Sequence, residues 1–71
     1  MFILSQNSDA IYDMDKISCV SAEDDGSVVF VNYNGETFEG GKYANGERAK
    51  EVVYELYTLL DAVSRYEMPV I

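Results

Sequence analysis

The sequence contains no histidine, no tryptophan and only one cysteine in 71 residues. Without histidine, the chain lacks the commonest general base, the commonest metal ligand and the usual partner of a nucleophilic serine or cysteine. A lone Cys19 cannot form an internal disulfide, and this cysteine usage fits a reducing, cytoplasmic setting. We therefore expect no enzymatic activity, no catalytic residue and no cofactor. We also expect Cys19 to lie mid-strand as a small buried hydrophobic residue.

Positive charge is scarce as well, with five Lys and Arg residues against thirteen Asp and Glu residues and a net charge of −8. This balance opposes binding to nucleic-acid phosphates or to an anionic membrane surface. No apolar run approaches the roughly 20 residues of a membrane span, and residues 1–5 lack the basic start of a signal peptide. We expect no direct nucleic-acid partner and no membrane association.

Two groups of carboxylates are candidate metal ligands. Asp13 and Asp15 are two residues apart and would share a face of a continuous strand. Asp24, Asp25 and Gly26 resemble the start of a calcium loop, but the later ligands of such a loop are missing. Both groups are interpreted as solvated acids in turns, so no metal site is expected.

The strongest pattern in the chain is amphipathic and lies in its last third. Apolar residues recur at intervals of three and four, which is typical of one helix face: Ala49, Val52, Leu56, Leu59, Val63 and Tyr66. Asn45 is a suitable N-cap, and Pro69 prevents continuation. The spacing predicts a helix over residues 45–67 and an extended tail over residues 68–71. A coiled coil is the alternative, but the pattern lasts only about two and a half heptads.

Residues 1–44 have the pattern of short strands separated by turns. The predicted strands cover residues 2–6 with 10–12, 17–23, 28–33 and 36–39. Asn34-Gly35 is a strong hairpin signal, and Gly26 suits a turn that requires a positive φ. Together these patterns predict one α+β domain over residues 1–71, a small antiparallel β-meander of about four strands with the long C-terminal helix packed across one face.

The turns also predict the pairing register. A two-residue loop at Asn34-Gly35 pairs Val31 with Phe38. The predicted helix-facing side of the sheet then comprises Val20, Ala22, Val29, Val31, Tyr33 and Phe38. Val28 and Phe30 lie on the opposite side. A register error of one residue would exchange the two sides.

The apolar residues exceed what one small sheet can cover. A helix of about 21 residues is about 31 Å long, whereas a six-residue strand spans about 20 Å. The end of the helix, the tail, the second sheet face and two tyrosines off the helix stripe are therefore predicted to form an interface. The candidate interface residues are Tyr54, Tyr57, Val63, Tyr66, Met68, Val70, Ile71, Val28 and Phe30. A homo-oligomer is expected, with a dimer favoured, and an unidentified protein partner is the alternative.

Three stretches resemble a group of short uncharacterised proteins from Gram-positive bacteria, their prophages and mobile elements. They are the opening residues 2–6, the segment 14–17, and residues 41–43 leading into 47–52. The resemblance implies a β-meander followed by one helix in an intracellular protein, and it implies no activity. The chain departs from the group at Asn45-Gly46, where Thr-Glu or Ser-Glu would start the helix better.

These observations favour a small non-enzymatic protein-interaction module that self-associates. The alternative function is an acidic inhibitor of the phage or mobile-element type, which would occupy a basic nucleic-acid-binding surface of another protein. An enzyme that uses Asp13 or Asp15 with a metal ion is the third and least supported hypothesis.

Overall fold

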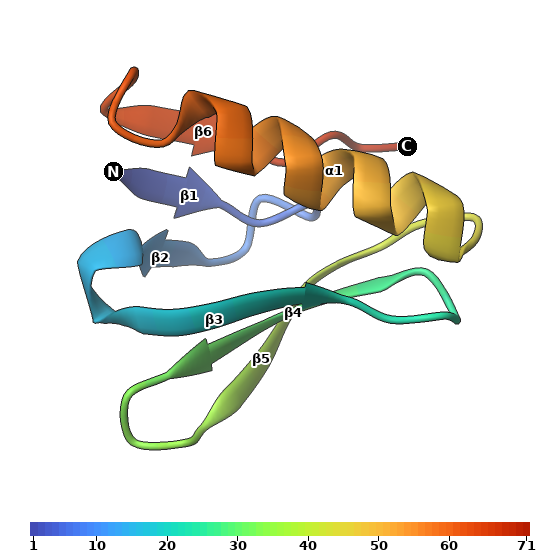
Figure 1. Ribbon diagram of the computed structural model, residues 1–71, viewed down its shortest axis with the longest axis horizontal. Coiled ribbons are helices and arrows are strands. Elements are labelled where there is room, and N and C mark those ends of the chain that lie inside the picture. Colours follow the sequence, from blue (N-terminus) through green and yellow to red (C-terminus); the bar gives the residue numbers. More distant parts are fainter.

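The computed structural model describes residues 1–71 and contains two three-stranded sheets and one α-helix (Figure 1). The elements in chain order are β1 (Phe2–Leu4), β2 (Ile11–Asp13), the 3-10 turn η1 (Met14–Lys16), β3 (Ile17–Ala22), β4 (Ser27–Asn32), β5 (Thr37–Lys42), α1 (Gly46–Leu59) and β6 (Arg65–Glu67). The predicted α+β class is confirmed. The prediction of one meander of about four strands is wrong, because the strands form two sheets, β2-β1-β6 and β3-β4-β5.

Two hairpins of the same design build the β3-β4-β5 sheet. In the first, the Glu23 amide donates to the Ser27 carbonyl and the Gly26 amide to the Glu23 carbonyl. In the second, the Asn32 amide donates to the Glu36 carbonyl and the Gly35 amide to the Asn32 carbonyl. Both loops therefore contain three residues and end on a glycine with positive φ, +95° and +84°.

The extra loop residue shifts the register by one position from the prediction. Val31 pairs with Thr37, and Phe30 pairs with Phe38. As a result Val28 and Phe30 are fully buried against the helix, whereas Tyr33 is exposed. The predicted assignment of the β4 faces is therefore wrong, because a shift of one residue turns every side chain of a strand to the other face. On β3, Val20 and Ala22 do pack against the core, as predicted.

The helix begins as predicted and ends earlier. Asn45 is the N-cap, and its side chain accepts a hydrogen bond from the Arg48 amide at 2.9 Å. The helix stops at Leu59, since Leu60 leaves the helical conformation with a ψ of 134° and Asp61 has a φ of +66°. Residues 60–67 are therefore not helical, which corrects the predicted helix over residues 45–67. No helix of the chain has the length and apolar character that crossing a lipid bilayer requires.

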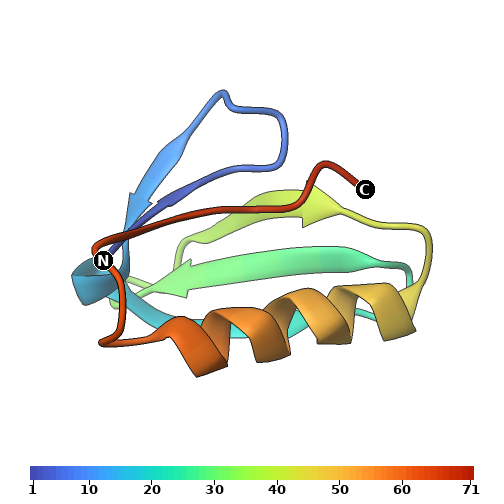
Figure 2. The same cartoon turned by 90° about the horizontal axis from the view of Figure 1, so that it is seen from above.

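After the helix the chain returns to the N-terminus. β6 pairs with β1 in parallel, with Tyr66 opposite Ile3, and β1 pairs with β2 antiparallel. In Figure 2 α1 lies along the β3-β4-β5 sheet, while the β1–β2 hairpin projects away on the other side of the C-terminal segment. A helix of 14 residues is about 21 Å long, close to the length of a six-residue strand. The shorter helix thus matches its sheet, and β6 covers the remaining apolar surface.

Gln6 joins the two sheets and the tail. Its amide donates to the Gly40 carbonyl at 2.9 Å, and its side-chain Oε1 accepts from the Lys42 amide at 2.6 Å. Its Nε2 donates to the Val70 carbonyl at 2.9 Å. The outer edge of β5 is therefore covered at these positions by residues that follow β1.

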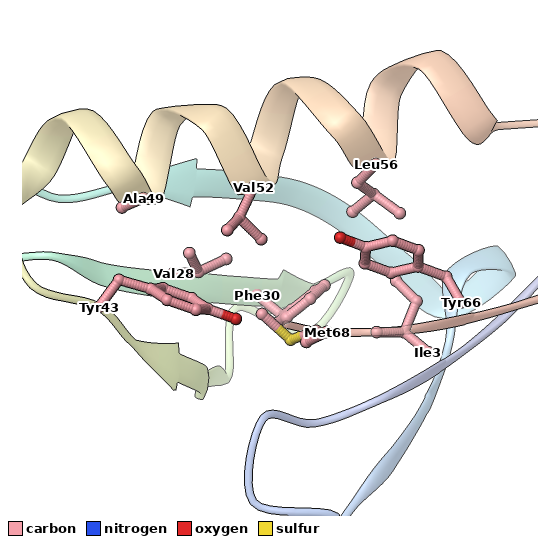
Figure 3. Packing of buried hydrophobic residues seen from close by; sticks show 9 residues of the cluster. All are labelled: Ile3, Val28, Phe30, Tyr43, Ala49, Val52, Leu56, Tyr66 and Met68. Carbon is pink, nitrogen blue, oxygen red and sulfur yellow. The ribbon is translucent and has the colours of Figure 1, made fainter. Parts of the chain in front are cut away.

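The core lies where α1, β4 and the β1–β6 pair meet (Figure 3). Its nine buried hydrophobic residues are Ile3, Val28, Phe30, Tyr43, Ala49, Val52, Leu56, Tyr66 and Met68. Phe30 is at its centre and stacks on Tyr12 with ring centroids 4.8 Å apart. Met14 packs on the rim of the core from η1.

The buried Tyr66 predicts a loss of stability at alkaline pH. Burial, together with the 2.6 Å hydrogen bond from its hydroxyl to the Glu55 carboxylate, raises the pKa of Tyr66 well above its usual range. The folded chain therefore holds this proton to a higher pH than the unfolded chain. The stabilisation is complete below the unfolded pKa of about 10 and is lost as pH rises above it.

We expect the urea midpoint of the native chain to fall between pH 9 and pH 11, and to fall less steeply in Tyr66→Phe. A Tyr33→Phe variant, which alters a solvent-exposed ring, is the matched control and should follow the native profile. If the urea midpoints of the native chain and Tyr66→Phe fell equally with pH, the raised pKa assigned to Tyr66 would be contradicted. The midpoint of Tyr66→Phe should still fall somewhat, because burial also raises the pKa of Tyr12 and of Tyr43.

Candidate interaction surface

Four of the nine candidate interface residues are not on the surface. Val28, Phe30, Tyr66 and Met68 are all buried in the core. The first two were misassigned because the hairpin loop has three residues. The other two were misassigned because the chain leaves the helix at Leu59 and adds a strand. These four residues are therefore corrected from interface to core.

The other five candidates are exposed, but they do not form one surface. Tyr54 and Tyr57 lie on α1 with ring centroids 6.1 Å apart, and they are 65% and 69% exposed. Val63 lies in the connection between α1 and β6. Val70 and Ile71 lie in the tail, where Gln6 and Arg48 donate to their carbonyl groups. The tyrosine pair is the part of the predicted interface that remains a candidate.

An open strand edge lies on the Tyr57 side of α1. β3 is at the edge of its sheet and is paired only with β4. The Glu23 amide donates to Ser27, so alternate residues of β3, Ser21 and Cys19, direct their amides and carbonyls toward β4. Val20 and Ala22 therefore direct theirs outward, into solvent. An exposed edge of this kind is a template for pairing with another strand.

A groove of about 230 Å³ runs between this edge and α1. Ile17, Cys19 and Val20 contribute to one wall, and Val53, Tyr57 and Leu60 contribute to the other. None of the residues that line the groove is charged. In a chain with thirteen acidic residues, this surface is suited to apolar contact.

Sequence reasoning did not find this groove, and it placed Cys19 wrongly. Cys19 is exposed, because its neighbour Val20 packs against the core and successive side chains of a strand point to opposite faces, so Cys19 lies on the uncovered face. Its side chain therefore lies on the surface beside the open edge. The signal available in the sequence was the uncharged run from Ile17 to Ala22, which contains no proline or lysine to block pairing.

Charged residues flank β3 at both ends. Asp13, Asp15 and Lys16 precede the strand, and Glu23, Asp24 and Asp25 follow it. Lys42 forms an ion pair with Asp25 at 2.9 Å. The hydrogen bond from Lys42, assisted by those from Ser27, lowers the pKa of Asp25 to about 2. Glu23 and Asp24 have no ion-pair partner within the chain.

A second apolar hollow lies on the outer face of the β2-β1-β6 sheet. Its volume is about 650 Å³, and its lining includes Phe2, Leu4 and Ile11, with Arg65 and Glu67 on β6. Phe2 and Ile11 are more than half exposed. This hollow was also missed, because the sheet exists only through the pairing of β1 with β6, which local sequence patterns do not reveal.

The carboxylates considered as metal ligands have local roles. Asp13 caps η1, and its Oδ1 accepts from the Asp15 amide at 3.0 Å. Asp25 Oδ1 accepts from the Ser27 amide, also at 3.0 Å. Their predicted placement in turns is confirmed. No three metal-ligating side chains gather at one place in the chain.

No family model, curated protein or solved structure matches the chain. The similarity to short proteins of mobile elements therefore stays a prediction.

Proposed function

We propose that the protein is a small non-enzymatic interaction module whose first partner is a second copy of itself. The observation that carries this proposal is the uncharged groove between β3 and α1, which has the open β3 edge as its rim. Such a groove offers backbone groups for hydrogen bonding and apolar side chains for burial at the same place. This combination is the basis of recognition by strand addition.

The contrast between the two edges of the β3-β4-β5 sheet supports the proposal. Gln6 covers the β5 edge with hydrogen bonds to Gly40 and Lys42. The β3 edge has no such cover, and the regular part of the strand, from Cys19 to Ala22, lacks charged side chains. Natural proteins usually block exposed edges with charge, proline or a covering segment. An edge left open beside an apolar groove is therefore consistent with a contact surface.

The distribution of acidic residues favours self-association over the acidic-inhibitor alternative. An inhibitor that imitates a nucleic-acid backbone needs its carboxylates in rows on one face. Here they occur on separate elements: the β3–β4 loop, the β2–η1 turn, the β4–β5 hairpin and the exposed side of α1. Asp13 and Asp25 are engaged in turns, and Glu55 accepts from Tyr66.

The proposal predicts that association becomes tighter as salt increases. Each copy carries a charge of −8, so two copies repel each other at long range, and salt screens this repulsion. Sedimentation equilibrium at micromolar concentrations should give twice the chain mass of 8.0 kDa. The dissociation constant should fall severalfold between 20 and 300 mM NaCl. A monomer at 300 μM in 300 mM NaCl would contradict self-association.

A further inference from the structure

Resting on the self-association proposed above, we infer how the second copy binds. β3 pairs antiparallel with β3 of the second copy about a two-fold axis at Val20. The two sheets become one sheet of six strands in the order β5-β4-β3-β3-β4-β5. The two helices then lie side by side on the same face, because the axis is perpendicular to the sheet.

The register follows from the direction of the backbone groups. In an antiparallel pair, two residues that both direct their amides and carbonyls toward each other form a hydrogen-bonded pair. Val20 and Ala22 direct theirs outward, as the pairing of Ser21 and Cys19 with β4 requires. Val20 can therefore pair with Val20 of the second copy, which leaves Cys19 opposite Ser21. The latter is a non-hydrogen-bonded pair, in which the Cα atoms are about 4.5 Å apart.

The position of α1 makes the two helices meet at packing distance. α1 packs over β3 and β4, so its axis lies about half a strand spacing inside β3. The two-fold axis lies half a spacing outside β3. With strands about 4.8 Å apart, the helix axes are about 10 Å apart, close to the 8–10 Å of packed helices. Val53 and Tyr57, on the groove side of α1, then face the second helix.

The residues along β3 suit a second copy of the same strand. In the antiparallel arrangement, Lys16 of each copy lies beside Glu23 and Asp24 of the other, and these two carboxylates have no ion-pair partner in the single chain. Asp13 and Asp15 lie at the same end as Lys16, so carboxylates outnumber cations at each end and salt should tighten the contact. The middle of the interface is uncharged, so no like charges are buried between the two strands.

The surface required is compatible with the size of the chain. A stable interface buries about 800 Å² on each partner, and the chain exposes 4649 Å². One strand edge alone buries too little for stability. The groove wall from α1, which includes Val53 and the exposed Tyr57, supplies further apolar area on the same side.

A cysteine-pairing experiment tests the geometry with the full chain. In Ser21→Cys, Cys19 of each copy faces position 21 of the other at a Cα separation suited to a disulfide. Mild oxidation should convert most of this variant to a covalent dimer at concentrations where the native chain is dimeric. The native chain and the double variant Cys19→Ser/Ser21→Cys place each cysteine opposite a serine. Both should remain more than 90% uncrosslinked.

The outcomes separate this inference from the proposed function. A dimer by sedimentation in which Ser21→Cys does not crosslink overturns the β3 pairing and leaves self-association intact. Crosslinking of Cys19→Ser/Ser21→Cys through position 21 overturns the register at Val20. A monomer at every salt concentration overturns both.

A second pair of variants tests the helix contact. Tyr57→Glu places a negative charge from each copy in the apolar helix contact and should weaken dimerisation by at least tenfold. Tyr33→Glu makes the same change at another exposed tyrosine, on the β4–β5 hairpin, and should change the dissociation constant less than threefold. Equal effects of the two variants would overturn the placement of α1 at the interface. The far-UV circular dichroism of both variants should match that of the native chain.

Discussion

Gly26→Ala is expected to destabilise the chain by about 2–5 kcal/mol, a large part of the stability of a chain of this size. The φ of Gly26 is +95°, a conformation that costs a residue with a Cβ about 1–2 kcal/mol. A Cβ at this position would lie 2.2 Å from the Tyr43 carbonyl oxygen. Because this oxygen belongs to the backbone, the contact is relieved only if the β3–β4 loop and the segment before α1 separate.

Gly35→Ala is the matched control for this prediction. Gly35 has a similar φ of +84°, but no atom lies within 4 Å of the site of its Cβ. Gly35→Ala should therefore lower the stability only by the conformational strain of about 1–2 kcal/mol. Thermal unfolding measures both, and Gly26→Ala should lower the midpoint by about 10 °C or more. Equal shifts for the two variants would contradict the close approach at Tyr43.

Phe30→Ala is the second substitution with a large expected effect. The ring is fully buried and stacks on Tyr12, so its truncation should cost about 3–5 kcal/mol. A chain of this length has only about 4–11 kcal/mol of stability in total. Phe38→Ala, which removes the cross-strand neighbour that is 37% exposed, should cost much less. Urea unfolding of the two variants provides the comparison.

Gly40 supplies a further test of the same packing. Its Cβ would lie 2.2 Å from Cε2 of Phe30 and 3.0 Å from the sulfur of Met68. Gly40→Ala should therefore destabilise the native chain by about 1–3 kcal/mol through overpacking. In the Phe30→Ala background the same methyl group fills part of the cavity, so the cost should disappear or change sign. Additive effects in this double-mutant cycle would show that the two sites do not touch.

The elements of the fold could be predicted from the sequence better than their arrangement. The turn at Asn34-Gly35 and the helix start at Asn45 depend on short local signals, and both are confirmed. The loop length was wrong because a two-residue turn of the favoured kind requires positive φ at both of its residues. Within the two hairpin loops, only Gly26 and Gly35 have a positive φ. The side chain of Asn32 also favours the longer loop, since its Oδ1 accepts from the Asn34 and Glu36 amides.

The end of the helix shows why the candidate site could be predicted only in part. The apolar spacing continues through Val63 and Tyr66, so periodicity alone gives no stop before Pro69. The helix ends at Leu59 because Tyr66 and Met68 bury more surface beside Ile3 than a projecting helix end could. The excess of apolar surface was correctly recognised, but β6 explains most of it. Tyr57 was found because it lies off the helix stripe, whereas the β3 edge required knowledge of strand order.

The parallel pairing of β1 with β6 determines when the fold can be completed during synthesis. Phe2 pairs with Arg65, a partner 63 residues later in the chain. At 5–20 residues per second, the ribosome needs about 3–13 s to supply that partner. During this interval β1 has β2 on one side but lacks β6 on the other, and Ile3 is not yet paired with Tyr66. The nascent chain can form its three local hairpins and its helix early, but the step that closes the core waits for residues 65–68.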